Sequence, residues 1–423
     1  MMKSPYKNEQ ILGMEYYITD TPGTGGHLRE TPEDFRVGEL FRDVKLTGGP
    51  HLICELEKTN WELQRAVKEI TKRLGISHKR IGWGGTKDKR AVTTQLISIY
   101  GIKAEDLEDF HLKDINLKPL GYANSQLSLG DLEGNNFDIW IRDCDGPDIA
   151  GNLESCVKTA QTGLPNYYGI QRFGVTRPVS HLVGIEMLKG NYKEAVFRYV
   201  GFPCDDEHEE TKTARQAFED NQDPKETLSL MPVYLRYERA MLHHLVEQPE
   251  DYKGALMVIP PKLLSMFVSA YQSYLFNRVL SKRIENSDNI SEPETGDRLI
   301  FPDGKEDIVT EKNIRTAKVH MKRGRCSLSI YMPGSEDYEI IGEMDRYAKE
   351  IMEETGITKK GFSEVTELVG ARFKGASRAI SMRTEIDYKI SENNINLKFT
   401  LPPGHYATTV CREIMKADPK NMI

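Results

Sequence analysis

The first third of the chain contains short runs of β-branched and aromatic residues separated by polar turns. PHLICELEK (50–58) and VTTQLISIY (92–100) have the composition of β-strands. FDIWIR (137–142) alternates apolar and polar residues, which is typical of a strand with one buried face. These segments predict a strand-rich N-terminal block.

One helix is predicted between the first two of these strands. Apolar residues recur there at helical spacing, at Leu63, Val67, Ile70 and Leu74. Thr59 and Glu62 fit a capping box at the start of the helix, and Gly75 can close its C-terminus. The Gly-rich segment IGWGGTKDKR (81–90) follows, so Asp88 is expected on a loop between two strand-like segments.

From about residue 164 the pattern changes to helices with polar connectors. The longest amphipathic helix is predicted over 262–283, and the polar segment 286–311 is expected to be an exposed excursion. Beyond residue 380 two strands return, ISMRTEIDYKI and INLKFTL, followed by a closing helix in ATTVCREIMK. A helix-rich block between two strand-rich blocks suggests an inserted domain.

The composition is that of a soluble globular chain of two or three domains, with 423 residues, 39% hydrophobic and 29% charged. No apolar stretch is long enough for a membrane helix, and the N-terminus lacks the apolar core of a secretory signal. The six cysteines include no CxxC pair. We therefore expect reduced thiols, no structural metal and a cytoplasmic protein.

Positive charge is concentrated in three runs, although the formal net charge is −7. They cover residues 72–90, 312–325 and 372–383, while acidic residues gather at 205–210. Basic runs often form an ordinary solvated face. Three such runs on an acidic chain nevertheless suggest one polyanion-binding side. We expect them to line one cleft between two domains, with the acidic run outside it.

Asp88 is the most informative candidate for chemistry. It is flanked by Lys87, Lys89 and Arg90 and preceded by Gly84-Gly85. Nearby cations favour the ionised carboxylate, and glycines allow a close approach of backbone or ligand. Such a carboxylate can act as a nucleophile or orient a hydroxyl. The alternative is a surface turn with ordinary ion pairs.

Other catalytic motifs are absent or poorly matched. The glycines at 23–26 and 82–85 lack the spacing of a phosphate loop, and there is no GxSxG elbow of a serine hydrolase. His243-His244 has no zincin pattern around it. The residues therefore give no indication of a nucleotide or metal cofactor.

Seven segments, in order and nearly end to end, resemble the TruD family of tRNA pseudouridine synthases. GGTKDKRAVTTQ (84–95) is similar to the family signature G-x-K-D-[RK]-x-A-x-[ST]-x-Q. The other matching segments are TPEDFRVGE (31–39), HLICELEKTNW (51–61), LGDLEGNNFDI (129–139), PNYYGIQRFG (165–174), FVSAYQSYLFN (267–277) and LPPGHYATTVCRE (401–413).

The resemblance implies an isomerase that converts a uridine of tRNA, at position 13 of the D-arm, into pseudouridine without a cofactor. It maps the catalytic aspartate onto Asp88, and whether this carboxylate adds to C6 or attacks C1′ stays open. The implied partner is tRNA, with neither a membrane nor an obligatory protein partner. A non-catalytic RNA-binding protein and a small-molecule glycosyl-transferring enzyme are the alternatives.

The resemblance also implies contacts to the target nucleotide. It maps them onto Phe35, Asn135 and Tyr406, and Phe137 is a candidate to stack on the uracil. Without the resemblance, core packing would be favoured for both phenylalanines. Tyr406 departs from the phenylalanine common in bacterial members. Weaker candidates for RNA contacts are Lys87, Lys89, Arg90, Lys318, Lys322 and Arg323.

The fold implied is an α+β pseudouridine synthase fold, a mixed and largely antiparallel sheet with flanking helices, interrupted by a large inserted α/β domain. We expect the catalytic domain over 1–163 plus 381–423 and the inserted TRUD domain over 164–380. Arg172 and Arg412 could clamp a phosphate, hold Asp88 or support the fold.

Overall fold

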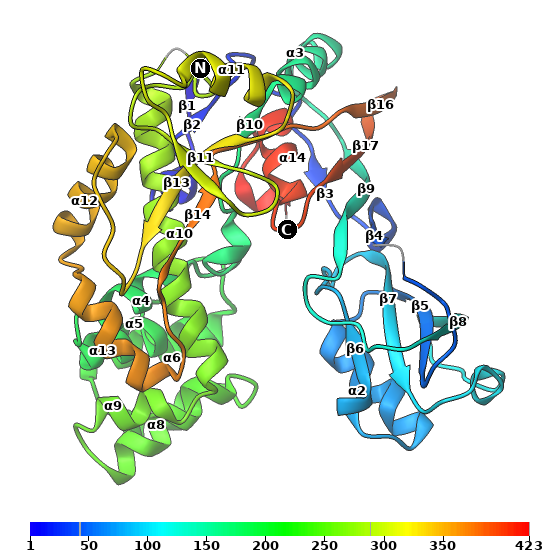
Figure 1. The fold of residues 1–423 in the computed structure, drawn as a ribbon. Helices are drawn as coiled ribbons and strands as arrows, with labels where there is room; N and C mark the ends of the chain where they lie inside the picture. The colour runs from blue at the N-terminus through cyan, green and yellow to red at the C-terminus, as the bar shows by residue number, and fades with distance from the viewer. Residues whose placement is uncertain (42–43, 288, 423) are drawn as a thin grey trace. The chain divides into compact units, whose positions relative to one another are not determined.

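The structure is a computed structural model that describes residues 1–41, 44–287 and 289–422. The chain forms two compact units, coloured along the sequence in Figure 1. The sheet unit contains Thr19–Leu164 and Met382–Ile423, and the helical unit contains Met1–Ile18 and Pro165–Ser381. A middle segment is therefore inserted into the sheet unit.

The N-terminal 18 residues belong to the helical unit, which differs from the boundaries expected from the sequence. There β1 (Met2–Lys3) pairs with β2 (Tyr16–Tyr17), and Leu12 is fully buried in the core of the helical unit. Ser281 also donates a hydrogen bond of 2.6 Å to the Gly13 carbonyl. Burial against the long helix that carries Ser281 fixes this segment, and no periodicity in the sequence reveals that choice.

A nine-stranded mixed sheet forms the sheet unit. Its path runs in the order β16-β17-β9-β4-β7-β5-β8, with β3 beside β9 and β6 beside β7. All of these pairs are antiparallel apart from β4 with β7. The strands are β3 (His27–Leu28), β4 (Phe35–Phe41), β5 (His51–Thr59), β6 (Ile81–Trp83), β7 (Val92–Tyr100), β8 (Ile115–Ala123), β9 (Leu132–Arg142), β16 (Ile386–Ser391) and β17 (Asn394–Leu401).

Three α-helices accompany this sheet: α2 (Leu63–Leu74), α3 (Ile149–Thr162) and α14 (Ala407–Met415). The apolar side of α2, with Leu63, Val67 and Ile70, packs in one core with β5 and β7 residues. The predicted helix is confirmed, and Gly75 ends it with φ of 65°. The predicted capping box is wrong, because Thr59 ends β5 and Glu62 itself accepts from the amides of Gln64 and Arg65.

The helical unit is built around α10 (Pro261–Glu285), which packs against α4, α12 and β13. Residues on several sides of α10 are buried, so the helix predicted over 262–283 is a core helix more than an amphipathic surface helix. The other helices are α1 (Lys7–Gln10), α4 (Ser180–Leu188), α5 (Tyr192–Val200), α6 (Glu209–Asn221), α7 (Pro224–Leu230), α8 (Arg236–Glu247), α9 (Tyr252–Met257), α11 (Ile314–Lys322), α12 (Glu343–Thr355) and α13 (Lys359–Val369).

A four-stranded sheet, in the order β12-β11-β13-β14, completes the helical unit. Its strands are β11 (Arg298–Ile300), β12 (Glu306–Ile308), β13 (Ser327–Pro333) and β14 (Gly375–Ala379), and the short pairs elsewhere include β10 (Leu164–Pro165) with β15 (Ser381–Met382). All neighbours in the four-stranded sheet are antiparallel, so the expected α/β type is wrong and the unit is α+β. The short connection between β11 and β12 allows only a hairpin, because parallel strands need a long crossover.

The expectation of an exposed excursion over 286–311 is also wrong. This segment supplies β11 and β12, and it buries Ile290, Leu299 and Val309 in the core of the helical unit. Scattered single apolar residues in a polar segment give no periodic signal, although each can fill a place in the core.

The six cysteines all lie among the described residues, and none of them forms a disulfide there. Cys54, Cys144, Cys156, Cys326 and Cys411 are buried. Burial raises the pKa of Cys54 and of Cys411 to about 12, which leaves these thiols protonated. Among the described residues, no helix is long and apolar enough to span a membrane.

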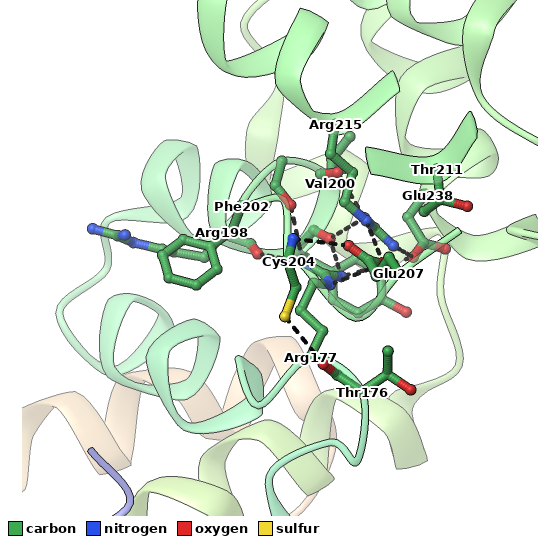
Figure 2. A network of polar contacts seen from close by, with 12 residues as sticks. Thr176, Arg177, Arg198, Val200, Phe202, Cys204, Glu207, Thr211, Arg215 and Glu238 are labelled. Atoms are coloured by element: carbon green, nitrogen blue, oxygen red, sulfur yellow. Dashed lines mark hydrogen bonds and ion pairs between the residues drawn. The ribbon is translucent and has the colours of Figure 1, made fainter. Parts of the chain in front are cut away.

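A buried ion network joins α6, α8 and the end of α5 in the helical unit (Figure 2). Arg215 donates to Glu207 at 2.9 Å, to Glu238 at 3.0 Å and to the Val200 carbonyl at 2.7 Å. Arg177 lies beside it, and burial lowers the pKa of Arg177 to about 10. Glu207 comes from the acidic run at 205–210, so this run is in part a structural element and not only a solvated face.

Removing one member of this network should destabilise the helical unit. Arg215→Met leaves two buried carboxylates with Arg177 as their remaining arginine partner, and we expect a loss of about 3–5 kcal/mol in the free energy of unfolding. Urea unfolding followed by circular dichroism measures this loss. Lys212→Met is the control on the same helix, because its partner Asp205 is 94% exposed and little change is expected. Equal losses in the two variants would contradict the prediction.

Candidate functional site

Asp88 lies on the loop between β6 and β7, as the sequence predicts. Its side chain is 45% exposed, and its carboxylate lies 3.5 Å from the guanidinium of Arg29. Arg29, the cationic partner of Asp88, is therefore distant from it in the sequence. The neighbouring Lys87 is not the partner, because its ammonium is buried and lies 2.7 Å from Glu39.

Arg29 is a site residue that the sequence analysis missed. It is 4% exposed, it has φ of 59°, and its guanidinium lies 3.9 Å from the ring centroid of Phe35. Nη1 also donates to the Met422 carbonyl at 3.0 Å. Burial lowers the pKa of Arg29, and the charge of Asp88 opposes this effect. The one sequence signal that could have revealed Arg29 was its position just before the TPEDF segment. It was overlooked because it lies outside the three basic runs.

The pairing of β4 with β7 brings Arg29 and Asp88 together. These strands are parallel, with Arg36 opposite Val92, so the segments that precede them reach the same edge of the sheet. Arg29 stands before β4 and Asp88 stands before β7. The acid and its cation therefore meet through sheet register.

The loop that carries Asp88 passes close to other backbone segments at its glycines. A Cβ atom on Gly84 would lie 3.0 Å from the Asp131 carbonyl oxygen, and the Gly130 amide donates to the Gly84 carbonyl at 2.8 Å. Gln95 donates to the Gly85 carbonyl at 3.0 Å. These contacts support the close approach that the paired glycines predicted.

Three of the candidate nucleotide contacts, Phe35, Asn135 and Phe137, share one face of the sheet. Register places Phe137 opposite Val37 and Phe399, and Asn135 opposite Glu39. The Phe137 ring stacks on Phe399 with centroids 5.4 Å apart and meets the Phe35 ring edge-on at 6.4 Å.

These candidates differ in how deeply their side chains are buried. Phe35 is 1% exposed and Phe137 is 7% exposed, which favours a packing role, above all for Phe35. Asn135 is half-buried, and its Oδ1 has no hydrogen-bond partner among the residues that the structure describes. This Oδ1 is itself buried, so in the structure it is an unsatisfied acceptor inside the protein and is not open to a base.

Of the remaining candidates, Tyr406 and Arg412 belong to the sheet unit and Arg172 belongs to the helical unit. Tyr406 is half-buried at the start of α14, and it belongs to the same unit as Asp88 although the inserted segment separates them in sequence. Arg412 is 3% exposed within α14. Arg172 belongs to the helical unit, where it donates to Ser273 at 3.0 Å, so a support role fits it better.

The basic candidates are divided between the units. Lys89 and Arg90 are exposed beside Asp88, whereas Lys318, Lys322 and Arg323 are exposed on α11 and its C-terminal end in the helical unit. Lys318 forms an ion pair with Glu292. In the third run, Arg378 lies 4.0 Å from the ring centroid of Tyr168 and Arg383 belongs to the sheet unit.

One cluster in the described part of the chain has metal-ligand residue types, namely His27, Glu30 and Asp143. The two carboxylates are exposed and each lies 3.9 Å from the histidine Nε2. Exposed groups at this spacing are ordinary surface ion pairs.

Comparison with known proteins connects this geometry to a family. The model of the family "tRNA pseudouridine synthase D (TruD)" matches residues 11–414. Relatives called "Probable tRNA pseudouridine synthase D" include proteins from Methanococcoides burtonii and Methanosarcina acetivorans, each 40% identical over 98% of both chains.

The fold agrees as well. The alignment with the crystal structure of the "Putative tRNA pseudouridine synthase D (TruD)" from Methanosarcina mazei covers 100% of both chains, with a TM-score of 0.85 and 38% identity. The match to the family model and to these relatives runs over nearly the whole length of the chain. The protein therefore belongs to the TruD family of tRNA pseudouridine synthases, which are isomerases.

Proposed function

We propose that this protein converts one uridine of tRNA into pseudouridine with the Asp88 carboxylate as the nucleophile. The observation that carries the proposal is the pairing of Asp88 with the buried Arg29 at 3.5 Å. Arg29 orients the carboxylate from inside the protein, while Asp88 stays 45% exposed and accessible to a substrate. This combination suits a nucleophile better than a surface turn.

The reaction is an isomerisation, so atoms balance without a co-reactant. The C1′–N1 bond breaks, the base rotates, a C1′–C5 bond forms, the proton on C5 leaves and N1 gains a proton. Asp88 can assist by adding to C6 of the ring or by attacking C1′, and it is released in either case. The base must leave its stack before it reaches the carboxylate, which costs a few kcal/mol.

The uracil would be recognised on the sheet face beside this loop. Once the buried Asn135 Oδ1 is uncovered on binding, it can accept the imide N3–H of uracil, and the amide nitrogen of the same side chain can donate to a ring carbonyl. Tyr406, at the start of α14, and Phe137, which is 7% exposed, are the proposed aromatic contacts. Phe35 supports them indirectly, because it packs between Arg29 and Phe137.

The sheet unit is the proposed catalytic domain with the pseudouridine synthase fold, and the helical unit is the proposed inserted TRUD domain. By resemblance, the target is position 13 of the D-arm. The exposed cations Lys89 and Arg90 near Asp88 and those on α11 are the proposed phosphate contacts. That the three basic runs line one RNA-binding cleft stays a prediction.

Asp88→Asn should abolish isomerisation while tRNA affinity stays nearly intact, because the amide has the same shape but is not a nucleophile. Incubation with unmodified tRNA, followed by mapping of pseudouridine, measures the loss and identifies the modified position. Asp109→Asn, at an exposed carboxylate in the same unit, should retain wild-type turnover. Residual turnover of the Asp88 variant within tenfold of wild type would exclude Asp88 as the nucleophile. Wild-type protein that binds tRNA without forming pseudouridine would favour the non-catalytic alternative.

Reversing Lys318, Lys322 and Arg323 to Glu should weaken tRNA binding and flatten its salt dependence. Each lost phosphate contact should reduce the slope of log affinity against log salt by up to about 0.7–0.9. Turnover at saturating tRNA should change little, because these residues are not part of the proposed site around Asp88. Binding titrations at several salt concentrations measure the slope.

The matched control for this experiment is the triple variant Lys225→Glu, Lys349→Glu, Lys360→Glu. These lysines are exposed on α7, α12 and α13, and they lie outside the three basic runs. The control carries the same change in net charge, so it should keep most of the slope. If the two triple variants behave alike, the residues on α11 contribute only to overall charge.

A further inference from the structure

Lys58 is a fully buried lysine that the proposed function has not yet used. It stands next to the end of β5, where the sheet register places it opposite Thr93 of β7 and Ile115 of β8. Its relative exposure is 0%. Lysine side chains are almost never fully buried unless they are paired, so this position needs a physical explanation.

The ammonium group of Lys58 binds two main-chain carbonyls. Nζ donates to the Trp61 carbonyl oxygen at 2.7 Å and to the Asp88 carbonyl oxygen at 2.9 Å. Trp61 lies just after β5, and Asp88 lies on the loop before β7. One side chain therefore ties the main chain of Asp88 to the end of β5, the strand that pairs with β7.

Burial of this cation is unfavourable by itself. It lowers the pKa of Lys58 to about 8, while the charges of Asp88 and Glu62 partly offset the effect of burial. A buried ion is often no more stabilising than an apolar side chain of similar size. Stability alone is therefore a weak reason for a lysine at this place, and its contact with Asp88 offers a stronger one.

We propose that Lys58 is a positioning residue, which fixes the main chain of Asp88 so that its carboxylate meets the substrate in a reactive orientation. The proposal rests on the proposed role of Asp88 as the nucleophile. Two buried cations then hold Asp88 from opposite ends, because Lys58 binds its carbonyl oxygen and Arg29 faces its carboxylate.

The loop that carries Asp88 is also held at residues before Asp88, which limits the effect of Lys58 to Asp88 itself. Gln95 holds Gly85 at 3.0 Å and Glu39 holds Lys87 at 2.7 Å, so the first part of the loop is tied to β7 and β4. At Asp88 itself, Lys58 supplies the tie to β5. Without it the Asp88 main chain can shift relative to the substrate, and a misplacement of about 1 Å can reduce a rate by about 100-fold.

Lys58→Met removes the ammonium group and keeps an unbranched side chain. We expect the single-turnover rate at saturating unmodified tRNA to fall by about 10- to 100-fold. The dissociation constant for tRNA should stay within about threefold of wild type, since Lys58 is buried and cannot touch RNA. Lys118→Met, at an exposed lysine of the adjacent strand β8, is the matched control and should retain both values.

A merely structural role would lower the melting temperature without changing the rate per folded molecule, so thermal unfolding is measured for each variant. Lys58→Arg keeps the charge and the donors, and it should recover at least part of the rate that Lys58→Met loses. If Lys58→Met does not fold, Lys58→Gln is measured instead. Its shorter side chain cannot reach both carbonyls, so the same loss of rate with intact affinity is expected.

Three results would overturn the proposal: a folded Met or Gln variant with a rate within threefold of wild type, a parallel loss of rate and tRNA affinity, or failure of both variants to fold. The Asp88→Asn experiment separates this proposal from the function on which it rests. An inactive Asp88→Asn beside a fully active Lys58→Met would refute the positioning role and leave the nucleophile in place.

Discussion

The parallel pairing of β4 with β7 is the constraint on which the site depends. Parallel strands begin at the same edge of a sheet, so the residues that precede β4 and β7 meet there. Arg29 reaches Asp88 for this reason. Strand β5 runs antiparallel to β7, with Thr59 opposite Val92, and its end therefore returns to the same edge with Lys58. A shift of β5 by one residue would turn Lys58 to the other face of the sheet.

The same sheet edge also provides partners for two buried cations. Arg29 and Lys58 are both buried, and a buried cation is expensive unless it has partners. Their partners are the carboxylate and the main-chain carbonyl of one residue, Asp88, together with the Met422 and Trp61 carbonyls. The cations and Asp88 support one another, which leaves the carboxylate fixed in direction but accessible from outside.

The inserted segment is stabilised by its own core and by its own polar network. The helix α10 is buried on several sides. In the polar network, the Arg215 guanidinium donates to the Val200 carbonyl at the end of α5 and to the carboxylates of Glu207 and Glu238. Such a unit can present exposed cations such as Lys322 and Arg323 without depending on them for stability. Under the proposed function, tRNA affinity and turnover can therefore be changed independently.

Local patterns in the sequence determined much of the fold. The strands over 92–100 and 137–142, the helix closed by Gly75, and the strands and helix after residue 380 all follow from periodicity and turn chemistry. These are short-range preferences of the backbone, so a single sequence reveals them. Asp88 and Asn135 are candidates chiefly through motif resemblance, because each stands in a short, specific segment.

The contacts between distant segments were decided only by the tertiary structure. Neither Arg29 nor Lys58 was singled out from the sequence, because their contacts with Asp88 appear only when the chain folds. The first 18 residues pack on the helical unit through Leu12 and Gly13, and the segment 286–311 joins a sheet through three-residue strands. Such outcomes depend on which surfaces can be buried together and on strand register. Local sequence specifies the elements, whereas the free energy of burying them against one another selects the partners.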